Sequence, residues 1–203
     1  SVGMGHTRWA THGEPSVRNA HPHVGATGQV AVVHNGIVEN FLDLRADLEA
    51  EGVVFNSDTD TEVIVHLVER YLGGGATLEE AARQTFRLLQ GSQAVVVMAT
   101  AEPDRLIVTR IGNAGGVTLG LGDDEMFIAS DMPAIVEHTR RVVYLESRQM
   151  AVVTRTGYRV TTLDGSVVRP DVHVVPFDAV SAEKGEYKHF MQKEIHEQGR
   201  ALT

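Results

Sequence analysis

The sequence predicts an α+β protein in which helices pack against a mostly antiparallel set of strands, forming a layered sandwich. Apolar residues recur at helical spacing through residues 39–89, whereas short apolar runs separated by Gly, Asp, Asn or Pro at hairpin spacing fill residues 92–162. A wholly apolar, β-branched run at 30–33 is typical of a strand buried on both faces. These observations together favour the layered arrangement.

Three helices are expected before residue 90. The first spans about 39–51 and stops before Gly52, and the second opens in the run of capping residues at 56–62. Thr77 and Glu80 form a capping-box pattern that predicts the start of the third. The expected core faces are Phe41, Leu42, Leu44 and Leu48 in the first helix and Ile64, Leu67, Val68 and Tyr71 in the second.

The strands of the second half are expected at short apolar runs. They are 94–98, 106–110, 117–121, 125–128, 142–145, 150–154 and 158–162. A brief helix is expected at 132–137, capped by Ser130 or Asp131, and a short strand at 53–55. Residues 2–5 have the pattern of the end of a strand, and 6–15 that of a loop.

Composition excludes several classes of protein. The 203 residues carry a net charge of −9, from 18 Lys and Arg against 27 Asp and Glu, so a nucleic-acid partner is not expected. No window approaches 18 uncharged apolar residues and no export signal is present, so we expect neither a membrane partner nor secretion, and a cytoplasmic location is the default. The absence of cysteine excludes disulfides, thiolate metal sites and a cysteine nucleophile among these residues.

Three polar stretches could together hold an amino acid with a reactive side-chain carbonyl. Arg8 lies in a loop with hydroxyl neighbours, where it is either a surface cation or a two-pronged ligand for a carboxylate. Asp58 and Asp60 are either helix caps or, for Asp60, a partner for an ammonium group. Asn35 and Gly36 form either a tight turn or a pair of donors for an oxyanion.

Five of the ten histidines lie in the first 36 residues. A metal site built on His6, His12, His21 and His34 is one interpretation, because imidazole is a common zinc ligand. Hydrogen-bonded structural histidines are the alternative, since no His-x-x-x-His pair lies on a predicted helix.

Six stretches in order resemble the glutaminase domain of the isomerising glutamine:fructose-6-phosphate aminotransferases, a branch of the class-II glutamine amidotransferases. They are HTRWATHG at 6–13, NAHPH at 19–23, VHNGIVEN at 33–40, SDTDTEVI at 57–64, FIASD at 127–131 and MQKEIHEQ at 191–198. The resemblance runs over essentially the whole chain. It implies an N-terminal-nucleophile hydrolase fold, a four-layer αββα sandwich incomplete at its start.

The resemblance also implies a reaction and a set of site residues. An N-terminal cysteine attacks the amide of glutamine, and the ammonia released converts fructose 6-phosphate to glucosamine 6-phosphate in a separate isomerase domain, with no cofactor and no metal. By motif position, Arg8 and Thr11 bind the glutamine carboxylate with His12 beside them. Asp60 binds the ammonium group, Asn35 and Gly36 form the oxyanion hole, and Trp9 lies in the loop that closes over glutamine.

The chain departs from that pattern at both ends. We expect residues 1–180 to form the amidotransferase domain without its cysteine segment, and 181–203 to form a linker, already begun at 175, and the first helix towards the isomerase domain. Ser1 is too far along the chain from Arg8 to replace the cysteine easily, since seven extended residues span roughly 20 Å. Without the cysteine segment, we expect these residues to bind glutamine weakly or not at all and to hydrolyse none, and we expect the complete enzyme to be a homo-oligomer.

Two other functions stay open. One is a non-catalytic module that binds glutamine or a partner domain through Arg8 and Asp60, and the other is a histidine–metal hydrolase. A measurement of ammonia release distinguishes the non-catalytic module from the glutaminase. A measurement of metal content distinguishes the histidine–metal hydrolase.

Overall fold

The computed structural model describes residues 2–113, 115–176, 187 and 189–201. The helices are α1 (Phe41–Ala50), α2 (Glu62–Gly73), α3 (Leu78–Leu88) and α4 (Phe190–Ala201), with 3-10 turns η1 (Val17–Asn19) and η2 (Met132–Ala134). The strands are β1 (His23–Val24), β2 (Val30–Gly36), β3 (Gln93–Ala99), β4 (Leu106–Ile111), β5 (Thr118–Leu121), β6 (Met126–Ala129), β7 (Arg141–Tyr144), β8 (Gln149–Thr154), β9 (Gly157–Thr162), β10 (Val167–Val168) and β11 (His173–Val174).

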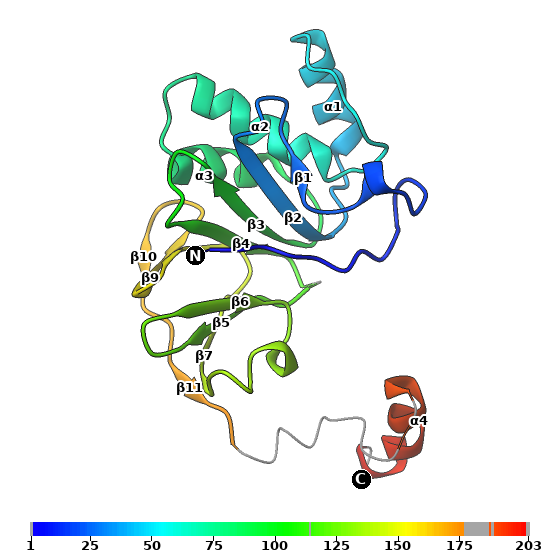
Figure 1. Cartoon of the computed structure of the whole chain (residues 1–203), viewed down its shortest axis with the longest axis vertical. Helices are drawn as coiled ribbons and strands as arrows, with labels where there is room; N and C mark the ends of the chain where they lie inside the picture. The colour runs from blue at the N-terminus through cyan, green and yellow to red at the C-terminus, as the bar shows by residue number, and fades with distance from the viewer. Residues whose placement is uncertain (1, 114, 177–186, 188, 202–203) are drawn as a thin grey trace.

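Two antiparallel sheets form the body of the molecule. The larger has the strand order β1-β2-β3-β4-β8-β9-β10, and the smaller has the order β11-β7-β5-β6. Helices α1, α2 and α3 cover one face of the larger sheet, and the smaller sheet lies on the opposite side (Figure 1). The predicted layered α+β arrangement is confirmed.

Alternation along β3 shows how the larger sheet holds two cores. Val95 and Val97 point into the core beneath the helices, whereas Ala94 and Val96 belong to the core between the two sheets. A strand alternates its side chains between faces, so a strand covered on both sides is apolar throughout. This is the physical reason why the runs at 30–33 and 94–98 contain almost no polar residue.

The outer face of the smaller sheet is covered by the segment that contains η2. A side chain at Gly120 would lie 3.1 Å from Ile135 and 2.9 Å from Thr139, and the Phe127 ring stacks on His138 with centroids 4.9 Å apart. Within the described residues, this short segment covers the face of the smaller sheet where the second helical layer of an αββα sandwich would lie. The predicted cap of this element is confirmed for Asp131, whose side chain accepts from the Met132 amide.

The three helices expected before residue 90 form, with one error in a core face, whereas the brief helix expected at 132–137 is only the 3-10 turn η2. Leu44 and Leu48 are buried, but Leu42 is 66% exposed, because α1 presents only a narrow apolar stripe to the core. Thr77 and Glu80 form both hydrogen bonds of the capping box. Helix α4 falls within the polar, helix-prone segment expected near the end.

Two predicted strands do not form. Residues 53–55 and 2–5 have no strand partner, and both are extended connections. An apolar run of three or four residues has too few side chains to show a period, so pairing decides its structure. Most of the expected linker at 175–184, and Ser1, lie outside the described residues. None of the described helices is long and apolar enough to cross a membrane.

Candidate functional site

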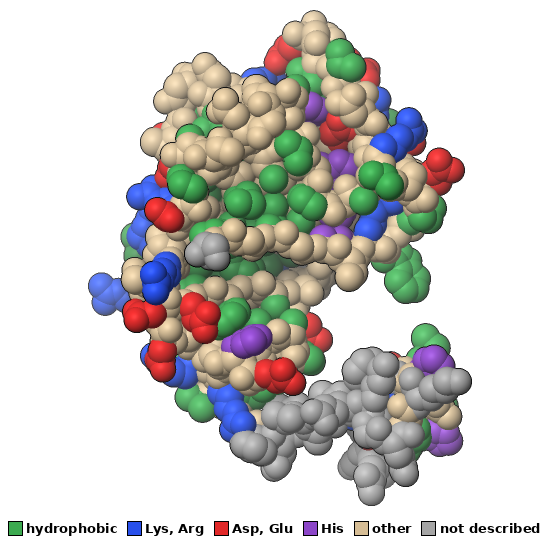
Figure 2. Space-filling model, in the orientation of Figure 1, with side chains coloured by type: hydrophobic (Ala, Val, Ile, Leu, Met, Phe, Trp, Pro, Cys, Tyr) green, Lys and Arg blue, Asp and Glu red, His purple; other side chains and the backbone are tan. Residues whose placement is uncertain are grey.

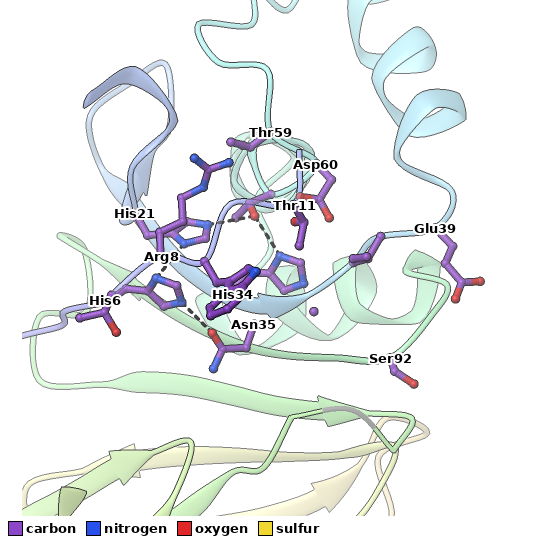
Figure 3. Close-up of a pocket in the computed structure, with 15 residues that line it drawn as sticks. His6, Arg8, Thr11, His21, His34, Asn35, Glu39, Thr59, Asp60 and Ser92 are labelled. Atoms are coloured by element: carbon purple, nitrogen blue, oxygen red, sulfur yellow. Dashed lines mark hydrogen bonds between the residues drawn. The ribbon is translucent and has the colours of Figure 1, made fainter. Parts of the chain in front are cut away.

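The loop after residue 5, the end of β2 and the entry to α2 meet at one cavity of about 490 Å³ (Figure 3). Its walls are His6, Thr7, Arg8, Trp9, Thr11, His21, His34, Asn35, Gly36, Ile37, Glu39, Thr59, Asp60, Thr61 and Ser92. Six of the seven residues predicted for the site are therefore brought together. His12 is the exception, since it does not line the cavity.

The backbone at the end of β2 requires a glycine. Gly36 has φ of +121°, a conformation that L side chains avoid, and a Cβ there would overlap the Ser92 carbonyl and lie 2.8 Å from Gln93 Cα. The strand therefore bends away tightly after Asn35, and helix α1 rather than a paired strand follows, so the alternative of a tight turn between two strands does not apply. The close approach of β2 and β3 holds Asn35 and the Gly36 backbone at the cavity wall.

Asp60 supplies a buried carboxylate at the entry to α2. The residue is 3% exposed, and its Oδ2 accepts a hydrogen bond of 2.8 Å from the Val38 amide. This contact ties the segment after β2 to the start of α2. The other oxygen, Oδ1, lies 3.9 Å from His12 Nδ1. A helix start favours negative charge, so this position suits a carboxylate.

The guanidinium of Arg8 holds the loop in shape. It donates to the carbonyls of His12, Gly13 and Glu14, with distances of 3.0 Å to Gly13 and 3.2 Å to Glu14. Arginine has five N–H donors, so these three bonds leave two for a ligand. Arg8 is therefore not a free surface cation, because three of its donors hold the loop.

Trp9 and Thr11 complete the predicted set on the same loop. Trp9 lines the cavity yet is 90% exposed, so its ring is not anchored in the core. The indole is therefore free to move against the cavity mouth. Thr11 lies between Arg8 and Asp60 in the close-up view (Figure 3).

A network of histidines and hydroxyl groups lies in the cavity wall, and it agrees with the alternative of hydrogen-bonded histidines. His6 contacts Asn35 and His21, and Thr61 contacts both His21 and His34. Histidine side chains gather on this face between α1 and the start of the chain (Figure 2). The clustering of histidines in the sequence was the signal, but their partners lie 15–40 residues away along the chain.

Burial favours the neutral form of His21 and His34 in this network. It lowers the pKa of His21 to about 3, together with the nearby His6. Burial also lowers the pKa of His34 to about 4, against the opposing effect of the Asp60 carboxylate. These rings therefore act near neutral pH as hydrogen-bonding groups with one proton each.

The metal interpretation is not supported. No three His, Asp or Glu side chains are placed to hold a metal ion within the residues that the structure describes. Both nitrogens of His21 are already engaged by His6 and Thr61.

Comparison with known proteins assigns the class. The chain matches the glutamine amidotransferase domain family over residues 6–137. Its fold is similar to that of glutamine phosphoribosylpyrophosphate amidotransferase from B. subtilis, with a TM-score of 0.66 and 24% identity over 83% of this chain and 39% of that one. A second structure, described as the allosteric regulatory enzyme of purine biosynthesis, gives the same TM-score and coverage at 26% identity.

The chain belongs to the glutamine amidotransferase domain family, with the N-terminal-nucleophile hydrolase fold. It is 49% identical to an isomerising glutamine–fructose-6-phosphate aminotransferase of Symbiobacterium thermophilum over 99% of the chain, and 46% identical to that of Methanothermobacter thermautotrophicus over 100%. It spans about a third of the length of these relatives, 32% and 34% respectively.

Proposed function

We propose that this chain is the glutaminase half of an isomerising glutamine:fructose-6-phosphate aminotransferase, which takes ammonia from glutamine for the synthesis of glucosamine 6-phosphate. The relatives support the reaction, since their names describe it and their identity extends over the whole chain. One observation carries the proposal. A cation on the loop, a buried anion and a strand-end amide line a single cavity.

The cavity walls match the groups of glutamine. The two remaining donors of Arg8, with the Thr11 hydroxyl, bind the α-carboxylate, and Asp60 accepts from the α-ammonium. The Asn35 amide and the Gly36 N–H stabilise the oxygen that becomes negative when the side-chain amide is attacked. His12 supports this site through its approach to Asp60. Trp9 closes over the bound substrate.

The attacking group of the reaction comes from outside these residues in our proposal. The 203 residues contain no cysteine, and a glutaminase of this class needs a nucleophile within about 3.5 Å of the amide carbon. We therefore expect binding of glutamine without hydrolysis. No cofactor is needed, because amide hydrolysis requires only a nucleophile, a base and oxyanion stabilisation.

The remaining parts of the proposal concern the complete enzyme. Residues 1–180 form the amidotransferase domain, and 181–203 lead towards a sugar-isomerase domain that binds fructose 6-phosphate. The enzyme is a cytoplasmic homo-oligomer without nucleic-acid or membrane partners. The net charge of −9 supports the absence of nucleic acid.

Calorimetric titration with L-glutamine tests the proposal. We expect saturable binding with one site per chain, and a weakening of about 10- to 100-fold in Arg8→Lys, because lysine keeps the charge but loses the planar donors. D-glutamine is the control ligand. Equal binding of both enantiomers, or no binding to the unsubstituted chain, would overturn the proposed substrate site.

Ammonia measurement separates the glutaminase from a pure binding module. The chain by itself should release no ammonia from glutamine. Joined to a segment that supplies an N-terminal cysteine, it should release ammonia, and a serine at that position should abolish the release. Binding without ammonia release in the joined protein would favour the non-catalytic module.

A further inference from the structure

We propose that a relay of four side chains fixes which end of the Asn35 amide faces the cavity. The relay consists of His6, His21, Thr61 and His34, and His6 is the positioning residue because it contacts Asn35 directly. The inference rests on the proposed function for one point only, the role of Asn35 as an oxyanion donor. It also gives the histidine cluster a purpose other than metal binding.

Four hydrogen bonds connect Asn35 to the core. His6 Nε2 lies 2.7 Å from Asn35 Oδ1, and His6 Nδ1 lies 3.0 Å from His21 Nδ1. The other nitrogen of His21 lies 3.0 Å from the Thr61 hydroxyl, which lies 2.9 Å from His34 Nδ1. Thr61 and His34 are 2% and 3% exposed, so the inner end of the relay is sealed from water.

Counting protons gives the relay a direction. Each neutral imidazole has one N–H and the threonine has one O–H, so four protons are available for four hydrogen bonds. Because Asn35 Oδ1 can only accept, His6 must donate from Nε2 and accept at Nδ1. His21 then donates from Nδ1, Thr61 donates to His21, and His34 donates from Nδ1.

This direction leaves one atom without a proton and without a partner. His34 Nε2 is buried and has no hydrogen-bond partner, as expected for the lone pair at the end of the relay. The reverse direction would put a proton on that nitrogen, and the candidate acceptor is Gln93, whose side chain interacts with the His34 ring but does not reach hydrogen-bonding geometry with it. A buried N–H without an acceptor is rarer in proteins than a buried acceptor without a donor.

The direction of the relay and the orientation of the Asn35 amide require each other. With Oδ1 held by His6, the amide nitrogen points away from His6 and is free to donate (Figure 3). In the reverse direction Asn35 would have to donate to His6, and its oxygen would face a developing negative charge. An oxyanion hole requires donors, so only the first direction serves catalysis.

The charged surroundings favour neutral rings in the relay. Arg8 and the neighbouring His23 disfavour a second proton on His21, in addition to the effect of burial. Asp60 acts in the opposite sense on His34, yet burial dominates there. The side chain that could reverse the relay is Gln93, whose Oε1 is also buried without a partner.

Nitrogen-15 NMR of the histidine rings at pH 7.5 tests the relay directly. We expect the proton on Nε2 in His6 and on Nδ1 in His21 and His34. Free histidine favours the Nε2–H form, so two of the three rings should show the less common tautomer. A proton on Nδ1 of His6, or on Nε2 of His34, would overturn the proposal.

A matched pair at Thr61 tests the consequence for Asn35. Thr61→Val removes the hydroxyl and should let His6 change tautomer, whereas Thr61→Ser keeps the hydroxyl and should keep the tautomers. Added glutamine should shift the Asn35 side-chain amide resonances in the serine variant but not in the valine variant. Affinity should fall by about three- to tenfold in Thr61→Val, the contribution of one neutral hydrogen bond.

A second threonine controls for a general effect on folding. Thr59 contacts His23 at 3.0 Å and lies outside the relay, so Thr59→Val should leave the His6 tautomer unchanged. If Thr59→Val changed that tautomer as much as Thr61→Val does, the relay would be wrong. The tautomers are read without ligand, so a failure of glutamine binding would count against the proposed function alone.

Discussion

Asp60 shows how one carboxylate can serve both the fold and the ligand. One of its oxygens accepts from the Val38 amide and so joins the segment after β2 to the start of α2. The other faces the cavity region and His12. Asp60 therefore does not cap α2, whose N-cap is Thr61 without a side-chain hydrogen bond, and its structural role is the link to Val38.

Replacing Asp60 by asparagine should separate these two roles. Asp60→Asn keeps an oxygen for Val38 and loses the charge, so glutamine should bind about 10- to 100-fold more weakly while the fold is retained. Asp58→Asn is the matched control, since Asp58 is half-exposed, pairs with Arg18 and lies outside the cavity. Calorimetry would measure the glutamine affinity of both variants. An equal loss of affinity in the two would contradict the assignment of Asp60 to the ammonium group.

For single residues, the sequence predicted which residues belong to the site better than it predicted their contacts. Arg8, Asn35 and Asp60 were predicted to converge, and they do. His12 was predicted beside the substrate, but it does not line the cavity, and its Nδ1 lies 3.9 Å from Asp60 Oδ1. The relay was not predicted at all, because a hydrogen bond between His21 and Thr61 depends on how β1 and α2 pack.

At the scale of elements, the end of β2 positions the oxyanion donors. β2 and β3 pair along their whole length, with Gly36 opposite Gln93. Only a residue without a Cβ allows the two backbones to approach so closely where the chain turns away.

Gly36→Ala should therefore destabilise the fold by at least about 2 kcal/mol, from the unfavourable φ and the overlap with Ser92. Gly28→Ala tests the effect of the backbone angle alone, because Gly28 has φ of +72° but open space around it. This variant should lower the free energy of unfolding by about 1 kcal/mol. Chemical denaturation would measure both variants. Equal losses of unfolding free energy in the two variants would show that the overlap with Ser92 does not destabilise the fold.

The capping box of α3 gives a second prediction for an element. Thr77→Ala removes the acceptor for the Glu80 amide and should lower the free energy of unfolding by about 1 kcal/mol. Thr77→Ser keeps the hydroxyl and should lower the free energy of unfolding only slightly. The same denaturation measurement applies, and a loss in the serine variant as large as in the alanine variant would exclude capping as the cause.

For the whole molecule, buried neutral histidines couple stability to pH. His21 and His34 have pKa values of about 3 and about 4 in the fold, against 6.5 in the unfolded chain. Between these values the unfolded chain binds protons that the folded chain does not, so stability falls as pH falls below about 6.5. Hydrogen bonds from His66, Asn56 and Ser57 outweigh burial and lower the pKa of Glu62 to about 2, which adds a loss of the same sign below pH 4.5.

We therefore expect the unfolding free energy to decrease from pH 7 to pH 5, approaching a slope of about 1.4 kcal/mol per pH unit for each such histidine. His21→Gln should reduce that slope, because the unfolded chain then has one histidine fewer to protonate. Denaturation at several pH values would measure the slopes. A flat profile from pH 7 to pH 5 would contradict the neutral network.

By itself, the sequence determined the class of fold, the helices, most strands and the ordered motifs of the amidotransferase family. These depend on local period, capping residues and motif order, which are properties of neighbours along the chain. Tertiary structure alone decided that the runs at 2–5 and 53–55 pair with nothing, that Leu42 faces outward and that His12 does not line the cavity. It also decided the histidine relay, because hydrogen bonds need distances and directions that exist only once separate segments have packed together.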